Sequence, residues 1–204
     1  MKNTFKKLSL ALLAVFTASL SSAFAAVQVG QPAPDFSLTD INGKTHQLSD
    51  FKGKTVVLEW VNPECPFVVK HYDSGNIPSL QKAAAADGVV WISINSGKAG
   101  AQGDFNPAQV SSWTSKAGAA PAAYCRDSDG KVGKLYGAKT TPQMYVITAD
   151  GTLAYNGAID SIRSSKQEDI AKATNYVTAA LASVKAGQPV AKATSEPYGC
   201  SVKY

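Results

Sequence analysis

The residues best suited to chemistry in this chain of 204 residues are its three cysteines, Cys65, Cys125 and Cys200. Cys65 follows an apolar run rich in β-branched residues, Thr55 to Val61, and Pro66 comes directly after it. Proline is favoured at the first position of a helix, where its missing N–H would be unpaired anyway. We therefore expect Cys65 at the N-cap of a helix that runs to about Tyr72. The free N–H groups and partial positive charge of such an end stabilise a thiolate, which predicts a reactive or disulfide-forming cysteine.

The neighbours of Cys65 give mixed support to a thiolate. Glu64 acts against it, because a nearby carboxylate disfavours a second anion. His71 lies six residues further on, about 240° round an ideal helix, and is expected to point away from the sulfur. Lys70 and His71 are therefore predicted to form a solvated face, whereas Tyr72 lies on the side of Cys65.

The first 25 residues have the pattern of a secretory signal peptide. Lysines precede an apolar run from Leu8 to Leu20, and the small residues Ala23 and Ala25 suit a cleavage site after Ala25. The apolar run is shorter than the roughly 20 residues that span a bilayer, so no membrane span is expected after removal of the signal. The pattern predicts a periplasmic or secreted protein, in a compartment where disulfides persist.

Charge and cysteine spacing exclude some classes of function. The net charge of +5 includes three lysines of the predicted signal, which leaves +2 for the rest of the chain. That charge, without an arginine-rich run, does not indicate nucleic-acid binding. Three widely spaced cysteines do not fit a zinc site, so no metal and no cofactor are predicted. An odd number of cysteines allows one intramolecular pair at a time and leaves one thiol over.

The remaining chain predicts one α/β domain over residues 26–186 and an arm over residues 187–204. Asn42-Gly43 indicates a β-hairpin, and Val89 to Asn95 resembles a second buried strand. Strands then alternate with helices, and a closing hairpin precedes a long helix from about Lys166 to Lys185. Glu59 interrupts the first buried strand, so its carboxylate must reach solvent or find a partner.

Several segments together resemble the redoxin branch of the thioredoxin superfamily, with its AhpC/TSA and peroxiredoxin-like exported proteins. They are "APDFSLTD", "LSDFKGKTVVLEW" with a cysteine just after the strand, "DSDGKVGKLYGAKTTPQMYVITADGTLAYNGAID" and the tail "PYGCSVKY". The resemblance covers residues 28–204. It implies a thioredoxin-like fold: a central mixed β-sheet flanked by helices, with an N-terminal β-hairpin extension and a C-terminal arm.

Residue by residue, the resemblance implies a redox site with two departures from its relatives. Cys65 matches the first cysteine of a thioredoxin C-x-x-C motif, but Val68 stands where the second would be. Pro142 matches the cis-proline that holds the backbone of Thr141 beside that sulfur. The threonine and proline that precede a peroxidatic cysteine are replaced by Asn62 and Leu58, which puts the standard peroxidase constellation in doubt.

The function implied by the resemblance is an exported thiol-dependent oxidoreductase. Cys65 would attack a small peroxide or a disulfide, and Cys200 would act as the resolving thiol. An arm from Gly187 to Cys200 can reach about 43 Å, ample for a domain with a radius of gyration of about 15 Å. The partners would be an external thiol reductant or a disulfide protein. Cys65 is then expected to be accessible and low in pKa, in a pocket shaped by four residues: Asn62, Pro66, Thr141 and Pro142.

An alternative is a non-catalytic binding module on the same fold, which would bind a metal or a protein partner. Its Cys65–Cys200 disulfide would be a permanent staple. For copper, the candidate ligands by type are Cys65, His71 and Met144. In either case Cys125, at a predicted strand end, is expected to be a packed free thiol.

Overall fold

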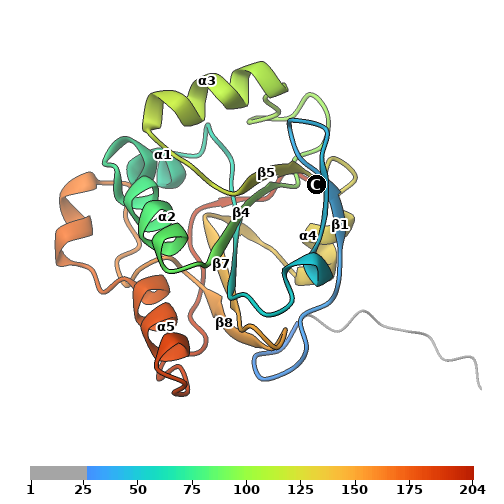
Figure 1. The fold of residues 1–204 in the computed structure, drawn as a ribbon. Helices are drawn as coiled ribbons and strands as arrows, with labels where there is room; N and C mark the ends of the chain where they lie inside the picture. The colour runs from blue at the N-terminus through green and yellow to red at the C-terminus, as the bar shows by residue number, and fades with distance from the viewer. Residues whose placement is uncertain (1–26) are drawn as a thin grey trace, which may run out of the picture.

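The structure is a computed structural model that describes residues 27–204 (Figure 1). The predicted signal peptide, residues 1–25, lies outside the described residues, so its cleavage stays a prediction. None of the helices that the structure describes is long and apolar enough to cross a bilayer.

A mixed five-stranded sheet forms the centre of the molecule, in the order β5-β4-β3-β7-β8. Its strands are β3 (Val56–Trp60), β4 (Val90–Asn95), β5 (Ala123–Arg126), β7 (Gln143–Ile147) and β8 (Leu153–Gly157). Strand β3 pairs parallel with β4 and antiparallel with β7. The mixed thioredoxin-like sheet expected from the sequence is thus confirmed, as is the N-terminal hairpin of β1 (Ser37–Thr39) and β2 (Thr45–Gln47).

Two hydrophobic clusters cover the two faces of this sheet. One lies under α1 (Pro66–Asp73), α2 (Asn76–Ala86), α3 (Pro107–Ala117) and α5 (Tyr176–Lys185). The other lies under the hairpin, the 3-10 helix η1 (Leu48–Phe51) and α4 (Lys131–Tyr136). Side chains of β3 alternate between them, since Val57 joins the first cluster while Leu58 and Trp60 join the second. Figure 1 shows α1, α2 and α5 on one side of the sheet and α4 on the other.

Glu59 on β3 is fully buried and finds the partners that its position demands. Its carboxylate accepts hydrogen bonds from the hydroxyl of Tyr72 on α1, from Trp91 Nε1 at 2.8 Å and from the hydroxyl of Ser93 at 2.9 Å. Burial raises the pKa of Glu59, although these hydrogen bonds act in the opposite direction. The carboxylate therefore connects α1, through Tyr72 near its C-terminal end, to β3 and β4.

The predicted long helix from Lys166 to Lys185 is wrong in its first half. The chain forms a 3-10 helix, η2 (Gln167–Lys172), and then a separate helix, α5. Asn175 caps α5, because its side chain accepts a hydrogen bond from the N–H of Thr178 at 2.9 Å. An asparagine satisfies the free N–H groups of a helix start better than it fits a helix interior, which explains the break.

The arm after Gly187 is docked along the domain. Beyond the end of α5 it pairs with β8, through hydrogen bonds between Asn156 N and Ala193 O and between Ser195 N and Asn156 O. It then forms the two-residue strand β9 (Cys200–Ser201), which pairs with β6 (Thr140–Thr141). Figure 1 shows this segment, in red, running from α5 to end beside α4.

Candidate active site

Cys65 occupies the helix N-cap that the sequence predicts. Its backbone is extended (φ −76°, ψ 122°), and α1 begins at Pro66. The N–H groups of Val68 and Val69 donate to the Cys65 carbonyl at 2.9 and 2.8 Å, which closes the first turn. The short connection from β3 thus places the sulfur at the end of the central strand and at the positive end of a helix.

Thr141 lies against the sulfur of Cys65, as the resemblance implies. The Thr141–Pro142 peptide bond is cis, and the Cys65 thiol donates a hydrogen bond to the Thr141 carbonyl at 3.1 Å. The Thr141 hydroxyl is buried and has no hydrogen-bond partner among the described residues. It can therefore donate to Cys65 when the sulfur is a thiolate.

The tail brings Cys200 to the same place. Strands β6 and β9 are antiparallel, with Cys200 directly opposite Thr141. Gly199 has a φ of +137°, and a Cβ at this position would lie far inside the van der Waals radius of the Thr141 carbonyl oxygen. Only glycine allows this close approach. The Tyr-Gly-Cys sequence of the tail is therefore built to lay Cys200 over Cys65 and Thr141.

Contacts after Cys200 hold the end of the tail. The N–H of Val202 donates to Lys139 O at 3.0 Å, and the N–H of Lys98 donates to Lys203 O at 2.8 Å. The Tyr204 hydroxyl donates to Ala138 O at 2.7 Å. The Tyr204 ring also packs directly over Gly133 of α4, where a larger residue would collide with it. Cys200 is thus fixed from its C-terminal side by backbone pairing and by an aromatic anchor.

The two sulfurs differ in exposure and in pKa. Burial alone would raise the pKa of Cys65, but hydrogen bonds from Cys200, from Thr141 and from N–H groups outweigh it and lower the pKa. Burial and the neighbouring Cys65 raise the pKa of Cys200 to about 11. The predicted low pKa of Cys65 agrees with this arrangement. The predicted accessibility is wrong, because the docked tail leaves Cys65 with 0% exposure.

Asn62 and Glu64 bind the loop that carries Gln102 and Gly103, beside the site. Asn62 Oδ1 accepts from the Glu64 N–H at 2.9 Å, and its amide donates to Gln102 O at 3.1 Å. The Glu64 carboxylate accepts from the Gly103 N–H at 2.5 Å. The pocket role predicted for Asn62 stays a prediction. Both polar atoms of its side chain are engaged with backbone groups, Oδ1 with the Glu64 N–H and Nδ2 with Gln102 O. Pro66 is placed next to the sulfur as the first residue of α1.

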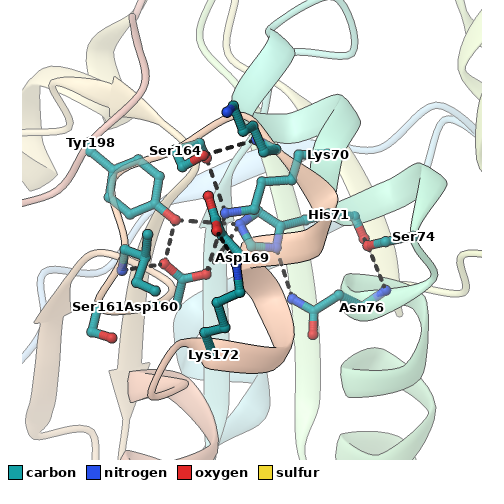
Figure 2. A network of polar contacts seen from close by, with 12 residues as sticks. Lys70, His71, Ser74, Asn76, Asp160, Ser161, Ser164, Asp169, Lys172 and Tyr198 are labelled. Carbon is teal, nitrogen blue, oxygen red and sulfur yellow. Dashed lines mark hydrogen bonds and ion pairs between the residues drawn. The ribbon is translucent and has the colours of Figure 1, made fainter.

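The predicted solvated face of α1 is wrong. Lys70 and His71 are buried, at 1% and 0% exposure, because the segment of residues 160–172 packs over the helix. Figure 2 shows the resulting network: Lys70 Nζ donates to Ser164 O at 3.0 Å, and both side chains lie 3.7 Å from Asp160 Oδ2. Sequence reasoning missed Asp160 and Tyr198, because the helical period of α1 carries no information about a segment 90 residues away.

Tyr198 connects this network to the tail. Its hydroxyl donates to Asp160 Oδ1 at 2.5 Å and lies 3.5 Å from His71 Nε2 (Figure 2). Its ring packs edge-on against Phe67, with centroids 5.8 Å apart. Tyr198 lies two residues before Cys200, so the network fixes the N-terminal side of the cysteine as the Tyr204 contacts fix the other.

The other candidate residues lie apart from this pair of sulfurs. Nδ1 of His71 faces Asn76 at 2.8 Å, and no cluster of three His, Cys, Asp or Glu side chains able to hold a metal occurs within residues 27–204. The structure thus does not assemble the copper set of Cys65, His71 and Met144. Cys125 is buried in β5, and burial raises its pKa to about 12, as expected for a packed thiol.

Comparison with known proteins assigns the chain to a family and supports the fold. The AhpC/TSA family profile matches residues 29–156, and the chain belongs to that family. A structure of a hypothetical protein from Sinorhizobium meliloti 1021 superposes with a TM-score of 0.74 at 25% identity, over 88% of this chain and 96% of that one. An uncharacterized conserved protein from Geobacillus kaustophilus gives 0.72 at 28% identity, over 87% and 92%.

Similarity to a curated protein is confined to part of the chain. Thiol-disulfide oxidoreductase ResA from Geobacillus thermodenitrificans (strain NG80-2) is 38% identical over 80 residues. The match covers 36% of this chain and 41% of ResA, so the chain spans less than half the length of that relative.

Proposed function

We propose that the protein is an exported thiol-disulfide oxidoreductase whose redox pair is Cys65 and Cys200. The observation that carries the proposal is the convergence of both cysteines on Thr141. The Cys65 thiol donates to its carbonyl, and Cys200 is its partner in the β6–β9 ladder. The tail thus supplies the second thiol that Val68 does not provide in α1. The name of the partial relative ResA supports the same reaction class.

The chemistry is an exchange between this pair and an outside thiol or disulfide. In the reduced protein, loss of two electrons and two protons joins the two sulfurs; in the oxidised protein, an outside dithiol returns them. The lowered pKa of Cys65 suits it to attack a sulfur atom or to leave from one. The partner is accordingly an external thiol reductant or a disulfide protein.

A small peroxide is the second candidate substrate, and the site supports it less well. Leu58 is an apolar core residue, and the Asn62 amide is engaged with Gln102 and Glu64. Neither therefore offers a free hydrogen bond to a peroxide. A thiolate attack on peroxide would also need access to Cys65, which the docked tail covers. Export rests on the signal pattern of residues 1–25 and is part of the proposal.

The test is a redox titration of the purified protein in glutathione buffers, with mass spectrometry to locate the disulfide. A Cys65–Cys200 bridge that opens above about −250 mV supports a working redox pair. A disulfide that is still closed when the buffer potential is below about −300 mV is a structural disulfide, and that result favours the binding module instead. Cys125→Ala is the matched control and should titrate as the wild type does, because Cys125 is buried in β5.

The binding module remains the second candidate because the tail is anchored independently of its cysteine. The Tyr198 and Tyr204 contacts hold it on both sides of Cys200. Under that reading a Cys200→Ser variant keeps full function in partner binding and shows no thiol turnover. Loss of disulfide exchange with an intact fold in both Cys65→Ser and Cys200→Ser is the result expected for the oxidoreductase.

A further inference from the structure

The two sulfurs of the pair are unequally placed with respect to solvent. Cys65 has 0% exposure, because it lies beneath the tail and within the hydrophobic cluster on the α1 face of the sheet. Cys200 is half-buried and packs against that cluster from outside. An outside thiol that approaches the docked protein therefore meets Cys200 before it meets Cys65.

We propose that Cys200 is the sulfur that exchanges with the outside partner, and that Cys65 reacts only within the protein, with Cys200. The inference rests on the proposed function, since it orders the two cysteines of that redox pair. It reverses the order expected from the sequence, where Cys65 meets the substrate and Cys200 resolves.

The tail is held too firmly for Cys65 to be the routine point of attack. Before Cys200, Tyr198 is buried and donates a 2.5 Å hydrogen bond to the buried carboxylate of Asp160. After it, Val202 pairs with Lys139, and Tyr204 packs over α4. Exposing Cys65 requires several of these contacts to break together, whereas Cys200 is partly exposed with all of them in place.

The reaction can be written for the oxidised protein and a partner dithiol. A partner thiolate attacks Cys200 Sγ; the Cys65–Cys200 bond breaks, a partner–Cys200 disulfide forms, and Cys65 leaves as a thiolate. The second partner thiolate then attacks the partner sulfur in this mixed disulfide. A disulfide forms in the partner, and Cys200 leaves and takes up a proton. The partner loses two electrons, and the protein gains them.

The leaving groups favour the same order. A thiol of lower pKa leaves faster in disulfide exchange. Attack on Cys200 expels Cys65, and the departing thiolate can accept hydrogen bonds from Thr141 and from the N–H groups of Cys200 and Val68, which act to lower its pKa. Attack on Cys65 would expel Cys200, whose pKa is raised by burial. The exposure of the two cysteines and the pKa of the leaving thiol both select Cys200 Sγ as the atom attacked.

The reverse reaction uses the same contacts. The Cys200 thiolate attacks one sulfur of a partner disulfide; a Cys200–partner disulfide forms, and the other partner sulfur leaves as a thiolate. The Cys65 thiolate beneath it then attacks Cys200 Sγ, forms the Cys65–Cys200 bond and expels the second partner thiolate. Cys65 is then the nucleophile of the closing step, as its lowered pKa suits, but it never bonds to the partner. This order also explains how a fully buried thiol can belong to a working redox pair.

The test uses the oxidised full chain and limiting glutathione, with acid quenching after short times and mass spectrometry of the mixed disulfide. The amount of glutathione bound to Cys200 is expected to exceed the amount bound to Cys65 by more than about tenfold, and Cys65 should be recovered as a free thiol. Equal labelling, or labelling mainly on Cys65, overturns the inference. If no Cys65–Cys200 disulfide is present before glutathione is added, the proposed function itself fails, which is a distinct result.

A tail variant checks that docking sets the order. Tyr198→Phe removes the hydroxyl that bonds Asp160 and keeps the ring against Phe67. It should shift part of the glutathione to Cys65. Tyr136→Phe, whose hydroxyl donates to Pro34 O in the cluster on the opposite face of the sheet, is the matched control and should keep the wild-type ratio. An unchanged ratio in Tyr198→Ala, which also loses the ring, contradicts the role of the docked tail.

Discussion

The buried His71 should make the stability of the protein depend on pH in a defined window. Burial lowers its pKa, and the neighbouring Lys70 lowers it further, against the opposing effect of Asp160; the pKa falls from the ordinary 6.5 to about 4. The unfolded chain therefore binds a proton on this histidine from about pH 6.5 downward, and the folded chain does so only near pH 4. Folded-state stability is lost as the pH falls through this window.

The size of the loss follows from the two pKa values. One pKa unit corresponds to about 1.4 kcal/mol, so a shift of this size costs about 3 kcal/mol by the bottom of the window. That is a large part of the roughly 5–15 kcal/mol that stabilises an ordinary domain. The charged groups that face His71 are Lys70 on the same helix and Asp160 on the segment after β8, with the Tyr198 hydroxyl between the helix and the tail.

The assay is urea unfolding of oxidised wild type and His71→Gln at intervals from pH 4 to pH 8. Above pH 7 the two free energies should differ by a constant amount, the cost of altering the contact with Asn76. Below pH 6.5 the wild type should lose stability relative to the variant, by about 3 kcal/mol at pH 4. Parallel curves across the whole range would refute the argument that His71 is held neutral by burial.

Four further outcomes are expected. Oxidation of the Cys65–Cys200 pair closes a loop of about 135 residues and should raise the free energy of unfolding by about 5 kcal/mol over that of the reduced form. Denaturant unfolding of the two forms measures this difference, and equal stabilities would show that the two cysteines do not pair. Gly199→Ala should displace β9 and expose Cys65 to alkylation, and unchanged protection would contradict the close approach to Thr141. Because burial raises the folded-state pKa of Glu59, the wild type should lose stability as the pH rises above the ordinary carboxyl pKa of 4.5. Glu59→Gln should abolish this loss, and a free energy of unfolding that still falls with pH in the variant would exclude Glu59 as its source. Cys125 should resist iodoacetamide at pH 8 until the protein is unfolded, since its pKa is about 12, and labelling of the native protein would contradict its burial.

Some features of the site follow from residues that are adjacent in the chain. A β-branched run followed by Cys65-Pro66 predicts a strand and a helix N-cap, because both preferences are local. Asn42-Gly43 predicts the hairpin for the same reason, and all three features are present in the structure. The cis peptide at Pro142 came from the resemblance to a family and is likewise confirmed.

The exposure of α1 could not be read from its own residues. A helical period predicts which side chains share a face, but it does not say what covers that face. Lys70 and His71 are polar, so the sequence favours solvent; the segment that carries Asp160 covers them instead. The cost of burying the Lys70 ammonium group is offset by Asp160 and Ser164, which lie more than 85 positions further along the chain.

The sequence by itself determined the fold class, the helix that begins after Cys65 and the presence of a second cysteine near the end of the chain. Only the tertiary structure decided that Cys200 lies over Thr141, that the tail covers Cys65 and that the two sulfurs differ in exposure. The physical reason is distance along the chain. Helix caps and turns depend on neighbouring residues, whereas the accessibility and pKa of a thiol depend on everything packed around it, here from β6 and from the last seven residues.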